Sequence, residues 1–158
     1  VAAYGAVDEL NSALGLAAAH SAESDVQALC REIQARLLDL GAYLAAPDAE
    51  RRQKSGIEAP PEADIEALER AIDGFEAELE PLRRFVLPGG TQAAAAFHVA
   101  RTVCRRAERA AVALDAEDTL APEALGYLNR LSDLLFVLAR VSNRRAGTPD
   151  VEWRRRGA

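Results

Sequence analysis

The sequence predicts an all-α protein, and three observations support this fold class. In five separate segments, apolar residues recur every three or four positions, which is the period of one face of an α-helix. All seven prolines lie between these segments or at their edges. No segment alternates apolar and polar residues as a half-buried strand would. We therefore expect one domain over residues 1–158, a bundle of five mostly antiparallel helices with largely short connections.

The first two helices are expected at residues 4–20 and 25–46. The first has an apolar side with Val7, Leu10, Leu14 and Ala17, and a polar side with Asp8, Asn11, Ser12 and Gly15. The second repeats its apolar residues at Val26, Leu29, Ile33, Leu37 and Leu40, and Pro47 ends it. Residues 48–61 have no period and contain one glycine and two prolines, so we expect a long loop there.

The third helix is expected at residues 62–80, followed by a turn that leads into the fourth. Its inward positions are Ile65, Leu68, Ile72, Phe75 and Leu79, and its many acidic residues are interpreted as a solvated face. The segment FVLPGGT, residues 85–91, breaks the helical pattern because a proline and two glycines follow one another. Thr91 at its end is a suitable N-cap for the next helix.

The fourth and fifth helices are expected at residues 92–114 and 122–145. Pro122 suits the first turn of the fifth helix, and Gly147 and Pro149 follow its end. Leucines 128, 131, 134, 135 and 138 with Val141 form its broad buried face. The opposite side carries Asn129, Asp133, Arg140 and Asn143. This polar stripe indicates either a polar site or a polar interface between subunits.

The stretch HVARTVCRRAER, residues 98–109, carries four arginines in a chain whose net charge is −6. On a helix its apolar stripe must face the core, with Ala100, Val103, Cys104, Ala107, Ala111 and Leu114. An adjoining face gathers His98, Arg101, Arg105, Glu108 and Arg109, whereas Arg106 points elsewhere. Arginines one turn apart repel by roughly 0.2–0.5 kcal/mol per exposed pair, so we expect an anionic partner to offset that repulsion.

Two kinds of anionic partner are compatible with this arginine face. Salt bridges to Asp8, Glu108 and Asp133 are one, and the phosphates of a polyanion, held by guanidinium forks, are the other. His98 is interpreted as a structural or hydrogen-bonding residue rather than a catalyst. The Pro-Gly-Gly turn can simply cap a helix, although a helix start beside glycines can also bind anions.

Composition excludes several classes of protein. No apolar run is long enough to span a membrane, and an acidic chain argues against general nucleic-acid binding. Cys30 and Cys104 stand alone, without the spacing of a zinc site, and favour a reduced, cytoplasmic location. With two histidines and no Glu-x-x-His pair, a di-iron bundle is unsupported. Residues 153–156, WRRR, are expected to form a solvated tail.

Several motifs, taken in order, resemble the PduO-type ATP:cob(I)alamin adenosyltransferases. They are AYGAVDELNSALGLA, LLDLGAYLA, FVLPGG, HVARTVCRRAER, YLNRLSDLLFVLAR and a closing tryptophan. The resemblance runs from Tyr4 to Trp153 and favours the polyanion over the salt bridges. It implies a ferritin-like helical bundle that assembles as a homotrimer with active sites between subunits. It also implies transfer of the 5′-deoxyadenosyl group of ATP to the cobalt of reduced cobalamin, with release of triphosphate.

The resemblance also implies roles for individual residues. The ATP-binding set is Arg105, Arg106, Glu108, Arg109 and Asn129, with Arg105 and Phe85 contributing to catalysis. Arg101 matches an arginine that forms a salt bridge to the aspartate of VDELN, here Asp8, in a neighbouring subunit, and Asp133 is grouped with this cobalamin-binding, intersubunit set. Phe85 matches the aromatic residue that covers the lower face of the corrin and keeps an axial ligand off cobalt.

Co(I) is itself a strong nucleophile, so this reaction needs no protein base, and the absence of a Ser-His-Asp or Cys-His set is expected. We expect Mg²⁺ with ATP, without assigned protein ligands, and as partners a reductase and an adenosylcobalamin-dependent mutase. The family's Thr/Gly/Asp-rich phosphate-binding segment precedes its first helix and is expected to be missing here, where the sequence begins at Val1. The rival hypothesis is a non-catalytic helical module whose arginine face binds an acidic partner.

Overall fold

Six helices make up the fold in the computed structural model, which describes residues 2–46 and 48–157. They are α1 (Ala2–His20), α2 (Ser24–Ala45), α3 (Ala49–Ser55), α4 (Glu62–Glu76), α5 (Gln92–Glu117) and α6 (Pro122–Arg145). The five long helices match the five that the sequence predicts, so the all-α prediction is confirmed. Within the described residues, β structure is limited to one isolated antiparallel bridge between Val86 and Glu152.

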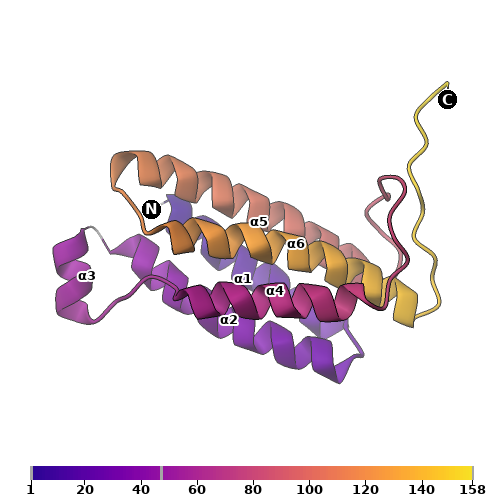
Figure 1. Cartoon of the computed structure of the whole chain (residues 1–158), viewed down its shortest axis with the longest axis horizontal. Helices are drawn as coiled ribbons and strands as arrows, with labels where there is room; N and C mark the ends of the chain where they lie inside the picture. The colour runs from indigo at the N-terminus through magenta and orange to yellow at the C-terminus, as the bar shows by residue number, and fades with distance from the viewer. Residues whose placement is uncertain (1, 47, 158) are drawn as a thin grey trace.

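The five long helices lie side by side, and four pairs of them form the main packing contacts. α1 packs against α2 and α5, α5 against α6, and α6 against α4. Long helices that follow one another along the chain run in opposite directions (Figure 1). α4 and α6, which pack on each other, are therefore parallel, and both run toward the end that carries the C-terminal tail. The loop between α4 and α5 lies at that same end, so it meets the residues that follow α6.

The core forms where the predicted apolar faces meet. The predicted inward residues of α1, including Leu10 and Leu14, are fully buried, as are the five predicted leucines of α6, from Leu128 to Leu138. Phe97 and Tyr127 are the largest fully buried side chains. Burying one leucine or phenylalanine side chain stabilises a fold by about 1.5–3 kcal/mol, so these faces hold the bundle together. None of the described helices combines the length and the apolar character that a membrane span requires.

The predicted loop at residues 48–61 is wrong in part, because it contains the seven-residue helix α3. Asp48 caps that helix by accepting a hydrogen bond from the Arg51 backbone N–H, and Gly56 ends it at a φ of 66°. Arg52 is buried, lies 4.4 Å from the centre of the Tyr43 ring and donates to the Tyr43 carbonyl. This tertiary anchor stabilises a helix that is too short to show a hydrophobic period.

α4 ends four residues earlier than predicted, at Glu76 rather than residue 80. The following residues contact α6 instead of continuing the helix. Arg145 forms hydrogen bonds with both carboxylate oxygens of Glu78, and Arg140 donates to the carbonyl of Glu80 at 2.9 Å. Contacts with another helix therefore decide where α4 stops. α5, in turn, extends beyond its predicted end to Glu117.

The predicted polar stripe of α6 divides into two parts with different surroundings. Asn129 and Asp133 are exposed, whereas Arg140 and Asn143 are buried. Arg140 pairs with Asp150 at 3.0 Å. Arg140 and Asn143 therefore contact loops of the same chain, and the prediction that they belong to a polar site or a subunit interface is wrong.

Asn143 contacts both loops at this end of the bundle. Its side chain accepts from the Thr91 N–H at 3.0 Å and donates to the carbonyl of Gly89 and to Asp150. Gly90 has a φ of 114°, and a Cβ there would collide with the Asn143 amide. The second glycine of the Pro-Gly-Gly turn is therefore required by both its backbone angle and its close approach to α6.

Candidate functional site

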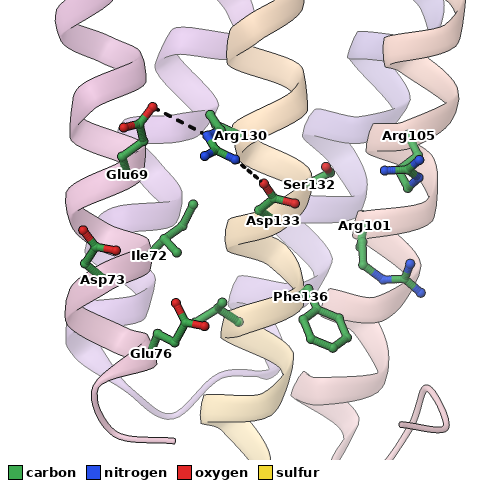
Figure 2. A pocket seen from close by; sticks show the side chains of 11 residues that line it. Glu69, Ile72, Asp73, Glu76, Arg101, Arg105, Arg130, Ser132, Asp133 and Phe136 are labelled. Atoms are coloured by element: carbon green, nitrogen blue, oxygen red, sulfur yellow. Dashed lines mark hydrogen bonds and ion pairs between the residues drawn. The ribbon is translucent and has the colours of Figure 1, made fainter. Parts of the chain in front are cut away.

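The arginine face of α5 lines an open pocket of about 550 Å³ beside α6. Figure 2 shows Arg101 and Arg105 on one side of it and α4 on the other. The α4 side is acidic, with Glu69, Asp73 and Glu76. Residues of α6 lie between them: Arg130, Ser132, Asp133, Phe136 and Val137. The pocket thus has a positive wall and a negative wall.

Arg101 and Arg105 form no ion pair with a carboxylate of the described residues, although they lie on a bundle rich in acids. Arg101 is half-buried, and its Nε atom is buried without a hydrogen-bond partner in the described chain. Burial and the nearby positive charge of Arg105 lower the pKa of the Arg101 guanidinium. A buried donor without an acceptor costs free energy, so Arg101 is the arginine of this wall that gains most from an acceptor outside the described chain.

The three carboxylates that the sequence suggested as salt-bridge partners of these arginines do not pair with them. Two contact other residues, and the third has no ion pair in the described chain. Asp133 pairs with Arg130 at 2.6 Å, and Glu108 accepts a hydrogen bond from Asn129 at 3.0 Å. Asp8 is exposed on α1 and forms no ion pair within the described residues. Within one protomer, the salt-bridge interpretation is therefore wrong for Arg101 and Arg105.

The residues predicted to bind ATP divide between two sides of α5. Glu108 is joined to Asn129 of α6 by its hydrogen bond, and Arg105 lies on this side because it lines the pocket beside α6. Arg106 points the other way and pairs with Glu9 of α1, as expected from its position on the helix. Arg109 is exposed. The protomer therefore brings Arg105, Glu108 and Asn129 to one face.

Phe85 lies in the loop at the end of the bundle, and 79% of its surface is exposed. It is therefore not part of the protomer core. It lines a second hollow of about 550 Å³ together with Leu82, Arg83, Arg84, Trp153 and Arg155. Its ring centre lies 6.3 Å from that of Trp153, with 56° between the ring planes. Three apolar side chains and three arginines therefore line this hollow.

The prediction that residues 153–156 form a solvated tail is wrong for Trp153. The Trp153 N–H donates to the carbonyl of Phe85 at 2.6 Å, and the Leu87 N–H donates to the carbonyl of Val151 at 2.7 Å. Sequence reasoning missed this pairing because neither segment shows a strand pattern. The available signal was the single tryptophan of the chain following Pro149.

His98 is buried against the ring of Phe136, with 6.0 Å between ring centres. Its burial is what a structural residue would show, but neither of its ring nitrogens has the expected hydrogen-bond partner in the described chain. Burial, aided by the charge of Arg101, lowers its pKa and favours the neutral form. Cys30 and Cys104 are free and buried, and burial raises the pKa of both thiols, that of Cys30 to about 12.

The chain is thus an α-helical bundle in which two arginines of α5 line an open pocket without an ion pair to a carboxylate of the described residues. The sequence model of the cobalamin adenosyltransferase family matches residues 1–142, and the chain belongs to this family. A cobalamin adenosyltransferase of Cupriavidus metallidurans is 46% identical over 156 residues, which cover 98% of this chain and 80% of that protein. The corrinoid adenosyltransferase of Bacillus subtilis is 42% identical over 159 residues, with the same two coverages.

A solved structure with the same fold carries both expected substrates. It is a variant of the PduO-type ATP:corrinoid adenosyltransferase from Lactobacillus reuteri complexed with cobalamin and ATP. It is 40% identical, has a TM-score of 0.88 and covers 98% of this chain and 86% of its own. Fold and family thus agree with the resemblance seen in the sequence motifs.

Proposed function

We propose that the chain transfers the 5′-deoxyadenosyl group of ATP to the cobalt of reduced cobalamin or a related corrinoid, forming adenosylcobalamin and releasing triphosphate. The observation that carries this proposal is the pair of arginines, Arg101 and Arg105, that line a pocket without a carboxylate partner in the described protomer. Membership of the cobalamin adenosyltransferase family supports the choice of ligand.

The reaction requires positioning and charge stabilisation rather than a protein nucleophile. Cob(I)alamin donates the electron pair on cobalt to the ribose C5′, the C5′–O bond breaks, and the triphosphate leaves with the electrons of that bond. Cobalt becomes Co(III) with a carbon ligand. Fixed guanidinium groups stabilise the charge that develops on the leaving triphosphate, and Arg105 is the exposed arginine best placed for this role.

The proposed ATP site combines this arginine with its neighbours on α5 and α6. Arg105 binds phosphate as a bidentate fork, while Glu108 and Asn129, already joined to each other, contact the nucleoside end or hold the arginines in place. Arg106 and Arg109 complete the predicted set. Arg106 pairs with Glu9 in the protomer, so it would have to contact ATP from the side of α5 that faces α1.

Mg²⁺ is proposed to enter with ATP. Within residues 2–46 and 48–157, no cluster of three His, Cys, Asp or Glu side chains is arranged to hold a metal ion. Nucleotide-bound Mg²⁺ keeps several waters and needs only one or two protein carboxylates beside the phosphates, so the residues present are compatible with it. The ion would help neutralise the triphosphate, the same task as that of Arg105.

A homotrimer with sites between subunits is proposed because the protomer leaves complementary charges unpaired. Asp8 is exposed on α1, and Arg101 has a buried Nε without an acceptor in the described chain. A salt bridge between Asp8 of one copy and Arg101 of the next would satisfy both. Asp133 lines the same pocket as Arg101, and this supports assigning it to the proposed intersubunit region.

Phe85 is proposed to cover the lower face of the corrin. Its ring is 79% exposed, so contact with a large apolar ligand would bury apolar surface and stabilise the complex. The ring would then exclude water or a base from the lower axial position of cobalt. Loss of that axial ligand makes reduction of Co(II) to Co(I) easier. A reductase that supplies the electron, a mutase that receives the product, and a cytoplasmic location complete the proposal.

A spectroscopic assay tests this function directly. The chain is mixed with Mg²⁺, ATP and chemically reduced cob(I)alamin, and the visible spectrum is followed for the photolabile cobalt–carbon bond, with an ATP-free control. We expect adenosylcobalamin only when ATP is present. Binding to acidic proteins that does not depend on nucleotide, with no product under any condition, would contradict the enzyme and favour the interaction module.

A further inference from the structure

The loop that carries Phe85 is paired with the segment that follows α6. Two backbone hydrogen bonds join residues 85–87 to residues 151–153, at 2.6 and 2.7 Å. An antiparallel bridge lies between them at Val86 and Glu152. We call these two paired segments the terminal ribbon. In this ribbon the backbone of Phe85 is held by the backbone of Trp153.

Buried polar contacts fix both arms of the terminal ribbon to α6. Asp150, directly before the second arm, receives hydrogen bonds from Arg140 at 3.0 Å and from Asn143 at 3.1 Å. Asn143 also binds Gly89 and Thr91, which come two and four residues after the first arm. The ribbon is therefore part of a rigid framework built on α6, and Phe85 projects from a fixed backbone.

The side chain of Phe85, in contrast, is held from one direction. Its ring packs at an angle on the ring of Trp153, and the rest of its surface faces solvent and the hollow lined by three arginines. Trp153 is itself 46% exposed, so the aromatic pair contributes little to the core. An exposed phenylalanine without such a neighbour would populate several side-chain conformations, and ordering it on ligand binding would cost entropy.

We propose that Trp153 is a positioning residue, which holds the Phe85 ring in the orientation that faces the lower side of the corrin. This inference rests on the proposed function and adds a second residue to it. Trp153 acts through Phe85: it keeps the ring in place before the corrin arrives, so that the axial position is closed as soon as cob(II)alamin binds. The one-electron reduction to cob(I)alamin then proceeds with an electron from the external reductant.

Loss of the Trp153 indole should slow the reduction of cob(II)alamin, because this step depends on whether cobalt keeps a lower axial ligand. Angled aromatic pairs favour one arrangement by up to roughly tenfold in an equilibrium. Removing the indole should therefore reduce the rate of adenosylcobalamin formation from cob(II)alamin about tenfold, equivalent to about 1.4 kcal/mol. Starting from preformed cob(I)alamin, the rate and the KM for ATP should change less than about twofold, because the nucleotide arginines lie on α5.

The experiment compares the parent chain with Trp153→Ala, Trp153→Phe and the control Val151→Ala. Val151 lies in the same arm of the ribbon with 59% of its surface exposed, and its backbone contact to Leu87 survives truncation. For each protein we would measure the melting temperature, the KM for ATP, both adenosylation rates, and the spectrum of bound cob(II)alamin with ATP. That spectrum distinguishes cobalt with a lower axial ligand from cobalt without one.

We expect Trp153→Ala to lose most of the signal of axially unligated cobalt while keeping its melting temperature within a few degrees. Trp153→Phe should recover at least half of that signal, and Val151→Ala should match the parent. If Trp153→Ala keeps the parent's spectrum and ratio of rates, or if both Trp153 variants unfold, the inference is overturned while the proposed function stands. If the parent chain forms no product from cob(I)alamin and ATP, the proposed function fails first and the inference with it.

Discussion

Arginines at two places on the bundle differ in what surrounds them. At the C-terminal end of α6, Arg140 pairs with Asp150, and Arg145 binds Asp25 and Glu78, both at 2.8 Å. On α5, by contrast, the described chain offers no carboxylate partner to Arg101 or Arg105. Both groups lie on helices and next to acidic elements.

The presence or absence of a carboxylate partner indicates which arginines stabilise the fold and which are available to a ligand or another subunit. Arg140 and Arg145 join elements far apart in the sequence, and their charges are satisfied before any ligand binds. The pocket arginines repel each other and form no ion pair with a carboxylate of the described residues. An arginine's partners in the folded chain, rather than its place on a helix, thus indicate its role.

The largest expected effect is on stability, for Arg140→Ala. This substitution leaves the Asp150 carboxylate half-satisfied and the Glu80 carbonyl without its donor, and breaking a buried pair in this way costs about 3–5 kcal/mol. Urea unfolding measures the loss. Arg144→Ala, at an exposed neighbour, is the control and should change stability by less than about 0.5 kcal/mol. Equal losses of stability in the two variants would contradict the stabilising role assigned to the Arg140–Asp150 pair.

Asp8→Ala tests whether the unpaired charges of the protomer meet between subunits. If Asp8 pairs with Arg101 of a neighbouring copy, its removal leaves a guanidinium buried in the interface and weakens assembly by about 3 kcal/mol. Sizing chromatography over a range of concentrations, with an activity assay, follows this loss. Glu32→Ala, which removes an exposed acid of α2, is the control. Unchanged assembly and unchanged activity together would contradict the intersubunit pair.

Arg105→Lys should leave the fold intact and slow the reaction. Lysine keeps the charge but cannot bind a phosphate as a planar fork, and loss of about 1.5–3 kcal/mol of charge-assisted bonding lowers kcat/KM for ATP by roughly 10- to 100-fold. Arg70→Lys, at an exposed arginine of α4, controls for the substitution itself. An unchanged kcat/KM would remove Arg105 from the nucleotide site.

The network around Arg145 predicts a dependence of stability on acid. Hydrogen bonds from Arg145 hold the pKa values of Asp25 and Glu78 below their ordinary values of 3.8 and 4.5. Each carboxylate thus stabilises the fold fully above its ordinary pKa, and the contribution disappears as pH falls through the lowered value. Because the carboxylates are largely solvated, the effect is about 1 kcal/mol or less.

Arg145→Met should therefore destabilise the chain at pH 7, and the difference from the parent should shrink below about pH 4. Urea unfolding at a series of pH values measures it. A difference that stays constant down to pH 2 would show that the carboxylates do not depend on Arg145.

Phe85→Ala should change stability little. A buried phenylalanine would cost about 3–5 kcal/mol, but this ring is mostly exposed and its removal should cost less than about 1 kcal/mol. Its effect should instead appear in adenosylation that starts from cob(II)alamin. Melting temperature and the cob(II)alamin spectrum measure the two properties. A large loss of stability with an unchanged spectrum would return Phe85 to a packing role.

The long helices were predictable because each bears its own signal. Periodic apolar residues set the buried faces of α1 and α6, and Thr91 caps α5 as expected, accepting from the Ala94 N–H at 3.1 Å. The division of the RRAER arginines between two sides of α5 also follows from helical geometry alone. The family motifs added an expected function that periodicity could not supply.

Features that depend on distant contacts were not predictable in the same way. α3 exists because Arg52 binds Tyr43 and Asp118, and α4 ends where Arg145 reaches Glu78. Trp153 was assigned to a solvated tail because no local pattern indicates that it pairs with Phe85. None of these partners is encoded in the spacing of neighbouring residues.

The sequence by itself determined the fold class, the buried face of each long helix and the family. These properties depend on residues within a few turns of one another, where helical period and motif order are sufficient. Only the tertiary structure decided which charges are already paired and which are free within the described protomer. Arg145 and Asp25 lie 120 positions apart in the chain, and such a pair exists only after the helices have packed. The same packing leaves Arg101 and Arg105 on an open wall, since no acidic side chain of a described element comes within ion-pair distance of them.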